Sequence, residues 1–149
     1  MIFWDTSAVV PLIVDEPSTA IALQEVERDP SMIVWWATPI ECLSAIARRE
    51  FDRSLSRRSA EHARQALGLL AAAWTEVLAG EEVREHAGRL LLRHRLRTAD
   101  ALQLGAALTW ARGRPRQHRI ATLDERLAAA ARGEGFGLVL PLGEGDEPG

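Results

Sequence analysis

Short apolar runs alternate with longer stretches of helical periodicity along the chain. Ile2-Phe3-Trp4 and Met32-Ile33-Val34-Trp35-Trp36 are too apolar for an exposed strand and too short to cross a membrane. Weaker strand candidates lie at 77–78, 119–122 and 136–140. Strands that alternate with helices are typical of a parallel sheet with helices on both faces. We therefore expect an α/β fold, with three layers (α/β/α) around a short parallel sheet of four to five strands.

Periodicity and capping residues predict the helices between these runs. Ser18, Thr38 and Thr98 are the expected N-caps of three of them, and Pro39 fits the first helical position. Gly133 or Gly135 is expected to end the last helix. The predicted helices cover about residues 6–14, 18–28, 38–55, 59–74, 80–94, 99–111 and 125–132.

Composition favours one domain in a reducing compartment. With 149 residues, of which 47% are hydrophobic and 26% charged, the chain can bury a core of its own, so we expect a single domain over 1–142. The Gly- and acid-rich stretch 143–149 is predicted to be a disordered tail. A single cysteine, no export signal and no membrane-length apolar run predict a cytoplasmic protein without membrane contact. A net charge of -3 argues against coating nucleic acid by electrostatics alone.

Four acidic residues stand at the ends of these predicted elements. Asp5 and Asp124 end strand-like runs, and Glu41 opens a helix that follows another. The carboxyl ends of parallel strands share one edge of a sheet, so these three acids are expected to lie close together. Asp100 has no obvious strand before it. It sits in the apolar run Ala99 to Leu102, where a charge is costly to bury without a partner.

Taken singly, each acid has an ordinary structural interpretation as a helix cap or as a partner of the helix dipole. Taken together, four carboxylates repel one another, which raises their pKa values or favours binding of a hard cation. Mg²⁺ suits such oxygen ligands, and Mn²⁺ is a possible substitute. The cation would activate water and neutralise charge on a phosphodiester. The pattern therefore favours a metal-dependent hydrolase.

Other chemistries find little support. The chain contains no lysine, which excludes a Schiff-base lysine and the lysine of a phosphate-binding P-loop. Cys42 has no histidine at a telling spacing, so we interpret it as a core residue. The four histidines lack zinc-ligand spacing, and Ser7 lacks the Gly-x-Ser-x-Gly elbow of esterases.

At the acidic residues the chain resembles the PIN-domain ribonucleases, and among them the VapC-type toxins of bacterial type II toxin–antitoxin pairs. The matching pieces come in the family's order and cover the chain to about Leu142. They are Asp5-Thr6-Ser7, Glu41 after Thr38-Pro39, Arg97-Thr98-Ala99-Asp100-Ala101-Leu102-Gln103-Leu104, and Ala121-Thr122-Leu123-Asp124.

This resemblance implies a PIN-like fold and magnesium-dependent cleavage of RNA by water that the metal activates. Asp5, Glu41, Asp100 and Asp124 would be both catalytic residues and metal ligands, with Asp5 and Asp100 the surest ligands. Ser7 and Thr122 would support them by hydrogen bonding. The resemblance further implies a homodimer and a cognate antitoxin whose tail covers the site.

RNA phosphates are best bound by arginine, whose planar guanidinium forms forked hydrogen bonds. Arg97 is close in sequence to Asp100, and Arg114 and Arg116 lie in a predicted loop, so these three are our candidates for RNA binding. Other candidates are the remaining arginines of the 112–119 loop and Arg48, Arg49, Arg53, Arg57 and Arg58. For most of them a solvated helix face is the ordinary interpretation. Two other functions stay open: a PIN-like interaction module that no longer cleaves, and a metal-dependent phosphatase.

Overall fold

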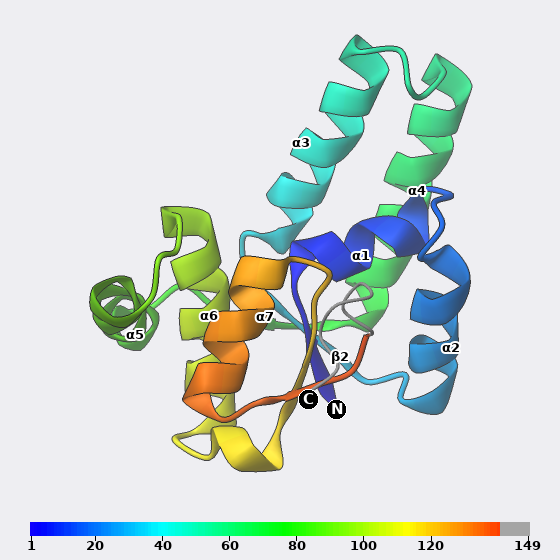
Figure 1. The fold of residues 1–149 in the computed structure, drawn as a ribbon. Helices are drawn as coiled ribbons and strands as arrows, with labels where there is room; N and C mark the ends of the chain where they lie inside the picture. The colour runs from blue at the N-terminus through cyan, green and yellow to red at the C-terminus, as the bar shows by residue number, and fades with distance from the viewer. Residues whose placement is uncertain (141–149) are drawn as a thin grey trace.

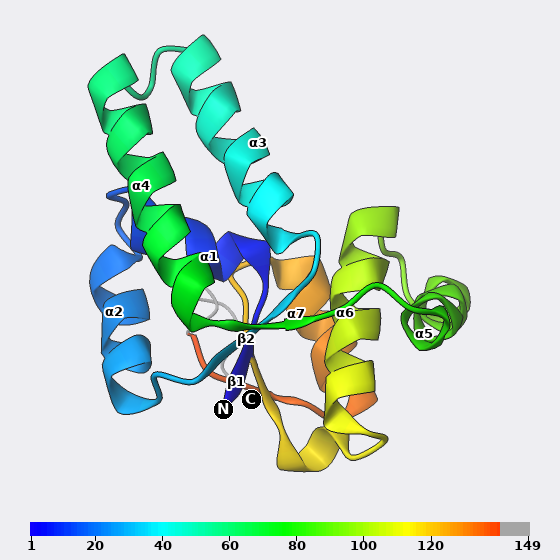
Figure 2. The same ribbon diagram turned by 180° about the vertical axis from the view of Figure 1, so that it is seen from behind.

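The structure, a computed structural model that describes residues 1–140, is a five-stranded parallel sheet with helices on both faces (Figures 1 and 2). The strand order is β3-β2-β1-β4-β5. The strands are β1 (Ile2–Trp4), β2 (Met32–Trp35), β3 (Thr75–Val77), β4 (Arg119–Ala121) and β5 (Gly137–Leu138). The helices are α1 (Thr6–Ile13), α2 (Thr19–Arg28), α3 (Thr38–Phe51), α4 (Arg57–Ala73), α5 (Glu81–Arg93), α6 (Thr98–Ala111) and α7 (Glu125–Glu134), with a 3-10 turn η1 (Pro115–Gln117). The predicted α/β class and parallel sheet are confirmed. The predicted tail, 143–149, lies outside the described residues.

The first strand is the centre of the sheet. Phe3 lies opposite Ile33 of β2 on one side and opposite Ile120 of β4 on the other. All three residues of β1 are buried, because the sheet is covered on both faces. The register aligns the carboxyl ends of β1, β2 and β4, and each of these strands is followed there by a loop or a helix start.

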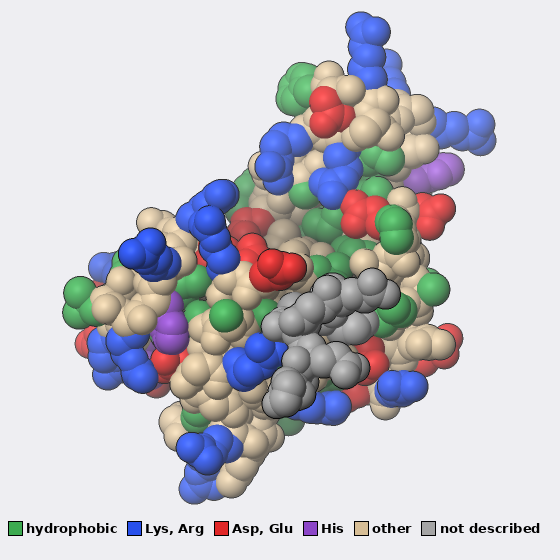
Figure 3. Space-filling view, viewed as in Figure 1, with side chains coloured by type: hydrophobic (Ala, Val, Ile, Leu, Met, Phe, Trp, Pro, Cys, Tyr) green, Lys and Arg blue, Asp and Glu red, His purple; other side chains and the backbone are tan. Residues whose placement is uncertain are grey.

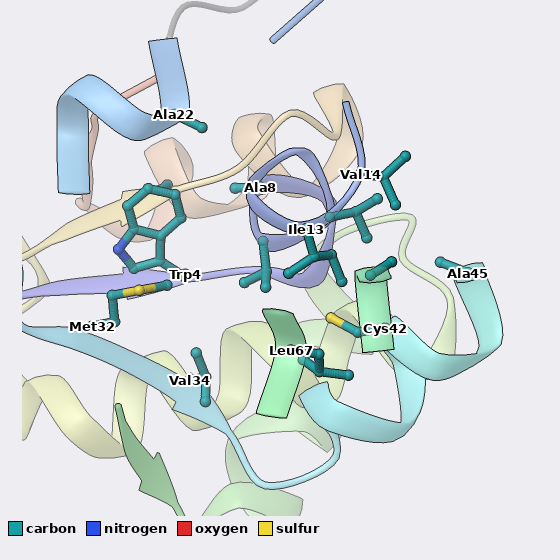
Figure 4. Packing of buried hydrophobic residues seen from close by; sticks show 14 of the residues in the cluster. Trp4, Ala8, Ile13, Val14, Ala22, Met32, Val34, Cys42, Ala45 and Leu67 are labelled. Carbon is teal, nitrogen blue, oxygen red and sulfur yellow. The ribbon is translucent and has the colours of Figure 1, made fainter. Parts of the chain in front are cut away.

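Two hydrophobic cores occupy the two faces of the sheet. Successive side chains of a strand point to opposite faces, so Trp4 packs in one core while Phe3 packs in the other. Trp4 lies with Met32 and Val34 under α1 to α4, as Figure 4 shows. Phe3 packs with residues of α5, α6 and α7 on the opposite face. The sheet is therefore the middle of three layers, as predicted.

Helices α5 and α6 pack at unusually short range. A Cβ atom added at Gly105 of α6 would lie 2.9 Å from the Val83 carbonyl oxygen and 3.1 Å from the Ala87 nitrogen, both in α5. Real Cβ atoms essentially never approach so closely. The two helices can adopt this spacing because residue 105 has no side chain.

Helices α3 and α4 form an arm that extends beyond the sheet (Figures 1 and 2). The base of α3 follows β2 and lies at the carboxyl edge of the sheet, so the arm forms one side of the space above that edge. Within the described residues, every helix is too short or too polar to cross a bilayer.

Several predicted element boundaries are wrong. Thr38 and Thr98 are the first residues of α3 and α6, where we expected them to be N-caps. Ser18 is the N-cap of α2, as expected, but its side chain makes no capping hydrogen bond. The Thr38 hydroxyl is instead buried and accepts a hydrogen bond from Gln103. Helix α4 begins two residues earlier than expected because the Ser56 hydroxyl accepts a hydrogen bond from the Ser59 nitrogen. Gly135 ends α7 with a φ of 107°.

Candidate active site

Asp5 is a buried carboxylate at the carboxyl end of the central strand. Its nitrogen donates to the Ala121 carbonyl oxygen (3.0 Å), and its side chain caps α1. Asp5 Oδ2 accepts hydrogen bonds from Ser7 Oγ (2.6 Å) and Thr122 Oγ1 (2.9 Å). Burial raises the pKa of Asp5 to about 6, although these hydrogen bonds lower it, and the charge of Asp124 raises it further. The carboxylate is thus held in place and easily protonated.

Ser7 and Thr122 join the start of α1 to the loop after β4. Their hydroxyl oxygens are 3.2 Å apart. Ser7 Oγ also accepts a hydrogen bond from the Leu123 nitrogen (2.9 Å), and Thr122 Oγ1 accepts one from the Asp124 nitrogen (3.1 Å). Each hydroxyl therefore orients Asp5 and fixes the backbone that carries Asp124.

Glu41 approaches the same edge from the first turn of α3. Thr6 Oγ1 donates to Glu41 Oε2 (3.2 Å), and Gln103 Nε2 donates to Glu41 Oε1 (3.3 Å). The pKa of Glu41 is raised to about 7, first by burial and then by the charge of Asp5, with a smaller contribution from Asp100. This carboxyl can exchange a proton near neutral pH.

Asp100 and Asp124 open two further helices. Asp100 is half-buried in the first turn of α6, and its pKa is raised by burial and by the charge of Asp124, while Arg97 and Arg126 lower it. Asp124 caps α7 through Oδ1, which accepts a hydrogen bond from the Leu127 nitrogen (3.0 Å). Each of these two acids therefore has a structural role at a helix start as well.

The four acids share one electrostatic environment. Asp124 raises the pKa of Asp5 and of Asp100, and both of those acids raise the pKa of Glu41. Figure 3 shows acidic side chains in a hollow between the α3–α4 arm and the rest of the molecule, with arginines over α3 and over the start of α6. The structure thus brings together the acids that the sequence placed at helix and strand ends.

The donor chemistry of this site fits a hard divalent cation, because every candidate ligand is a carboxylate. The hydrogen bonds that Asp5 accepts from Ser7 and Thr122 both go to Oδ2. A bound cation would also be favoured because it relieves the repulsion between neighbouring carboxylates. Across residues 1–140, however, no three His, Cys, Asp or Glu side chains are arranged so that they could hold a metal ion.

Gln103 is a site residue that its place in the sequence did not single out. Its side chain is 1% exposed, and its Nε2 lies near three oxygens: Thr6 Oγ1 (2.9 Å), Thr38 Oγ1 (3.3 Å) and Glu41 Oε1. The amide thereby links α6 to α1 and α3. Its Oε1 is buried without a hydrogen-bond partner in the described part of the chain. The available signal was a lone amide in the mostly apolar stretch Ala101–Leu108, where a buried polar group needs partners.

The three predicted RNA-binding arginines lie at different edges of the sheet. Arg97 precedes α6 and lies close enough to Asp100 to lower its pKa. Arg114 lines a separate pocket with Trp110 and His118, beyond the end of α6, and Arg116 belongs to η1, just before β4. The structure therefore brings Arg97 to the acids and places Arg114 and Arg116 at the amino edge of the sheet.

Residues 2–133 match the sequence profile of the PIN domain. Comparison with curated protein sequences finds no match. Among solved structures, Mycobacterium tuberculosis VapC20, a Sarcin-Ricin loop cleaving toxin, is 22% identical with a TM-score of 0.66, over 95% of this chain and 100% of that chain. FitAcB from Neisseria gonorrhoeae is 16% identical (TM-score 0.64; 95% and 98% covered). A toxin–antitoxin complex from Klebsiella pneumoniae is also 16% identical (TM-score 0.62; 86% and 91% covered). At these identities the likeness establishes the fold.

Proposed function

Because the chain belongs to the PIN domain family, we propose that it is a metal-dependent endoribonuclease and the toxin of a toxin–antitoxin pair. The observation that carries this proposal is the group of four carboxylates at the carboxyl edge of the sheet, in which each acid interacts electrostatically with two of the others. RNA as substrate is supported by the likeness to VapC20, a Sarcin-Ricin loop cleaving toxin, and a cognate antitoxin by the likeness to the toxin–antitoxin complex from Klebsiella pneumoniae. We further propose a single domain over 1–142, a homodimer and a cytoplasmic location.

Asp5, Glu41, Asp100 and Asp124 are the proposed ligands of Mg²⁺ or Mn²⁺. When bound, the cation would act as a Lewis acid and neutralise charge on the phosphodiester. Ser7 and Thr122 hold the Asp5 carboxylate in one orientation.

Glu41 is the proposed proton acceptor for the attacking water. In the chain without a bound cation the pKa of Glu41 is about 7, so its carboxylate can take a proton at neutral pH, as a general base must. Gln103 and Thr6 hold its two oxygens toward α6 and α1. Arg97 is the proposed arginine contact to RNA closest to the acids. Arg114 and Arg116 are proposed contacts to more distant phosphates of the same RNA.

A PIN-like interaction module without cleavage is the second candidate. The observation that favours it is that no ready-made group of metal ligands exists among the described residues. The nuclease and the interaction module predict different results in an RNA cleavage assay. No observation favours the metal-dependent phosphatase.

The test is cleavage of RNA by the purified protein with Mg²⁺ or Mn²⁺, beside EDTA. Asp5→Ala should abolish cleavage, whereas Glu85→Ala, which removes an exposed carboxylate on α5, should retain it. Cleavage that persists in EDTA or in Asp5→Ala would contradict the proposal. The absence of both metal-dependent stabilisation and cleavage of total cellular RNA would favour the interaction module.

A further inference from the structure

A pocket of about 590 Å³ opens beside Glu41, between α1 and α3. This volume falls in the range of roughly 300–1,000 Å³ that is typical of sites for small ligands. Thr6, Ser7 and Glu41 line the side toward the acids, so the pocket continues directly from the candidate active site. Ser44 and Arg48 line the side formed by α3.

The pocket offers both apolar and polar surface. Val10 and Leu123 contribute side chains that suit the flat face of a base or a ribose. The Ser44 hydroxyl is exposed there and can donate a hydrogen bond. A ligand with a ring, hydroxyl groups and a negative charge would match this lining.

Two neighbouring arginines of α3 line the pocket, but only one has a free guanidinium. Arg49 Nη2 forms an ion pair with Glu16 Oε1 (2.7 Å), and its Nη1 donates to the Ala45 carbonyl oxygen (3.1 Å). The exposed Arg48 guanidinium makes no ion pair or hydrogen bond with any residue in 1–140. Arg49 thus shapes the wall, and Arg48 is available to an anion.

The Arg48 guanidinium, which is unpaired within residues 1–140, can offset the repulsion between the acidic site and RNA phosphates. The four acids repel the phosphates of any RNA strand that approaches them. Arg48 lies at the far side of the pocket from the acids, in the last turn of α3. A guanidinium there can attract a phosphate that lies next to the reacting one.

We propose that this pocket holds the nucleotide adjacent to the cleaved bond, with Arg48 bound to its phosphate; the inference rests on the proposed ribonuclease function. From the acids, the bound RNA then runs along α3 toward the end of the α3–α4 arm. Arg114 and Arg116, at the amino edge of the sheet, take no part in this contact.

The test measures RNA binding separately from cleavage. The parent protein is Asp5→Asn in EDTA, and the probe is a short fluorescein-labelled oligouridylate, whose binding is followed by fluorescence anisotropy over a range of salt concentrations. Arg48→Gln is compared with Arg28→Gln, which removes the same charge from an exposed position in the last turn of α2. Ser44→Leu reduces the space in the pocket without changing the charge.

Each phosphate contact on a single strand contributes about 0.7 to the slope of log affinity against log salt. Arg48→Gln should therefore lower that slope by about 0.7 and weaken binding at low salt roughly threefold. Arg28→Gln should leave both unchanged. Ser44→Leu should weaken binding and keep the parental slope.

Unchanged binding by Arg48→Gln, or the same loss in Arg28→Gln, would overturn the pocket assignment. A parent that binds no RNA would overturn it together with the proposed function. If the parent binds and Arg48→Gln shows the expected loss while wild-type protein fails to cleave, only the nuclease activity is contradicted. Circular dichroism melting of each variant separates these results from unfolding.

Discussion

Thr122 Oγ1 donates a 2.9 Å hydrogen bond to Asp5 Oδ2, although the two residues are 117 positions apart in the chain. The same oxygen accepts a hydrogen bond from the Asp124 nitrogen. One buried hydroxyl therefore connects the acid after β1 with the acid after β4. Its removal should affect both the pKa of Asp5 and the stability of the edge of the sheet.

Thr122→Val tests this connection. The variant loses a donor to the charged form of Asp5, so the pKa of Asp5 should rise above about 6, as followed by carboxyl carbon NMR. The Asp124 nitrogen loses its partner, so unfolding in urea should show a loss of about 1–3 kcal/mol. Thr109→Val is the matched control, because its hydroxyl bonds only the Gly105 carbonyl of the same helix. An unchanged Asp5 titration in Thr122→Val would contradict the assigned role.

Gln103→Leu should raise the pKa of Glu41 above about 7. The substitution removes the Nε2 donor that stabilises the Glu41 carboxylate and also removes the buried Oε1 without a partner. Loss of the Nε2 donor lowers the free energy of unfolding, whereas removal of the unpartnered Oε1 raises it. We therefore expect a large change in the pKa of Glu41 and only a modest change in the free energy of unfolding. If Glu41 accepts the proton, the low-pH limb of the rate profile should move to higher pH. Gln65→Leu, on the exposed side of α4, should leave the profile where it is.

Without metal, the protein should lose stability as pH rises from about 4 to about 7. The pKa of Asp5 is raised from 3.8 to about 6 and that of Glu41 from 4.5 to about 7, so the folded chain binds more protons than the unfolded chain in this range. Stability therefore falls with rising pH until both groups are ionised, by an amount on the order of a few kcal/mol. Urea unfolding at a series of pH values measures this slope. Asp5→Asn should make it shallower, and a rise in stability over the same range would refute the coupling.

Gly105→Ala should destabilise the protein by about 1–3 kcal/mol, because the added Cβ meets the backbone of α5 at 2.9 Å. Gly88→Ala is the control within α5, where nothing lies within 4 Å of the added atom. That change should be neutral or stabilise the helix by up to about 1 kcal/mol. Thermal melting of the two variants should therefore shift in different directions. Equal melting temperatures would show that α5 can move away from α6 at little cost.

The sequence predicted much of this site because strand ends and helix starts are local features. Asp5, Glu41 and Asp124 each follow a predicted strand, and parallel pairing brings such positions to one edge. Asp100 was assigned to the site through the resemblance to the PIN-domain ribonucleases, because a helix and not a strand precedes α6. Gln103 and the pocket at Arg48 depend on how α6 and α3 are oriented against α1. That orientation comes from packing between distant segments, which periodicity along one segment does not contain.

The place of β1 in the middle of the sheet has a consequence for the timing of folding. Its pairing with β4 joins Phe3 to Ile120, so a loop of most of the chain must close before the central strand has both neighbours. Contacts so distant in sequence fold slowly, and during translation β1 leaves the ribosome long before β4 is made. Asp5 and Asp124 cannot meet in a partial chain. The acidic site is therefore assembled only when synthesis is nearly complete, so a truncated product that ends before β4 would carry three of the acids but no finished site.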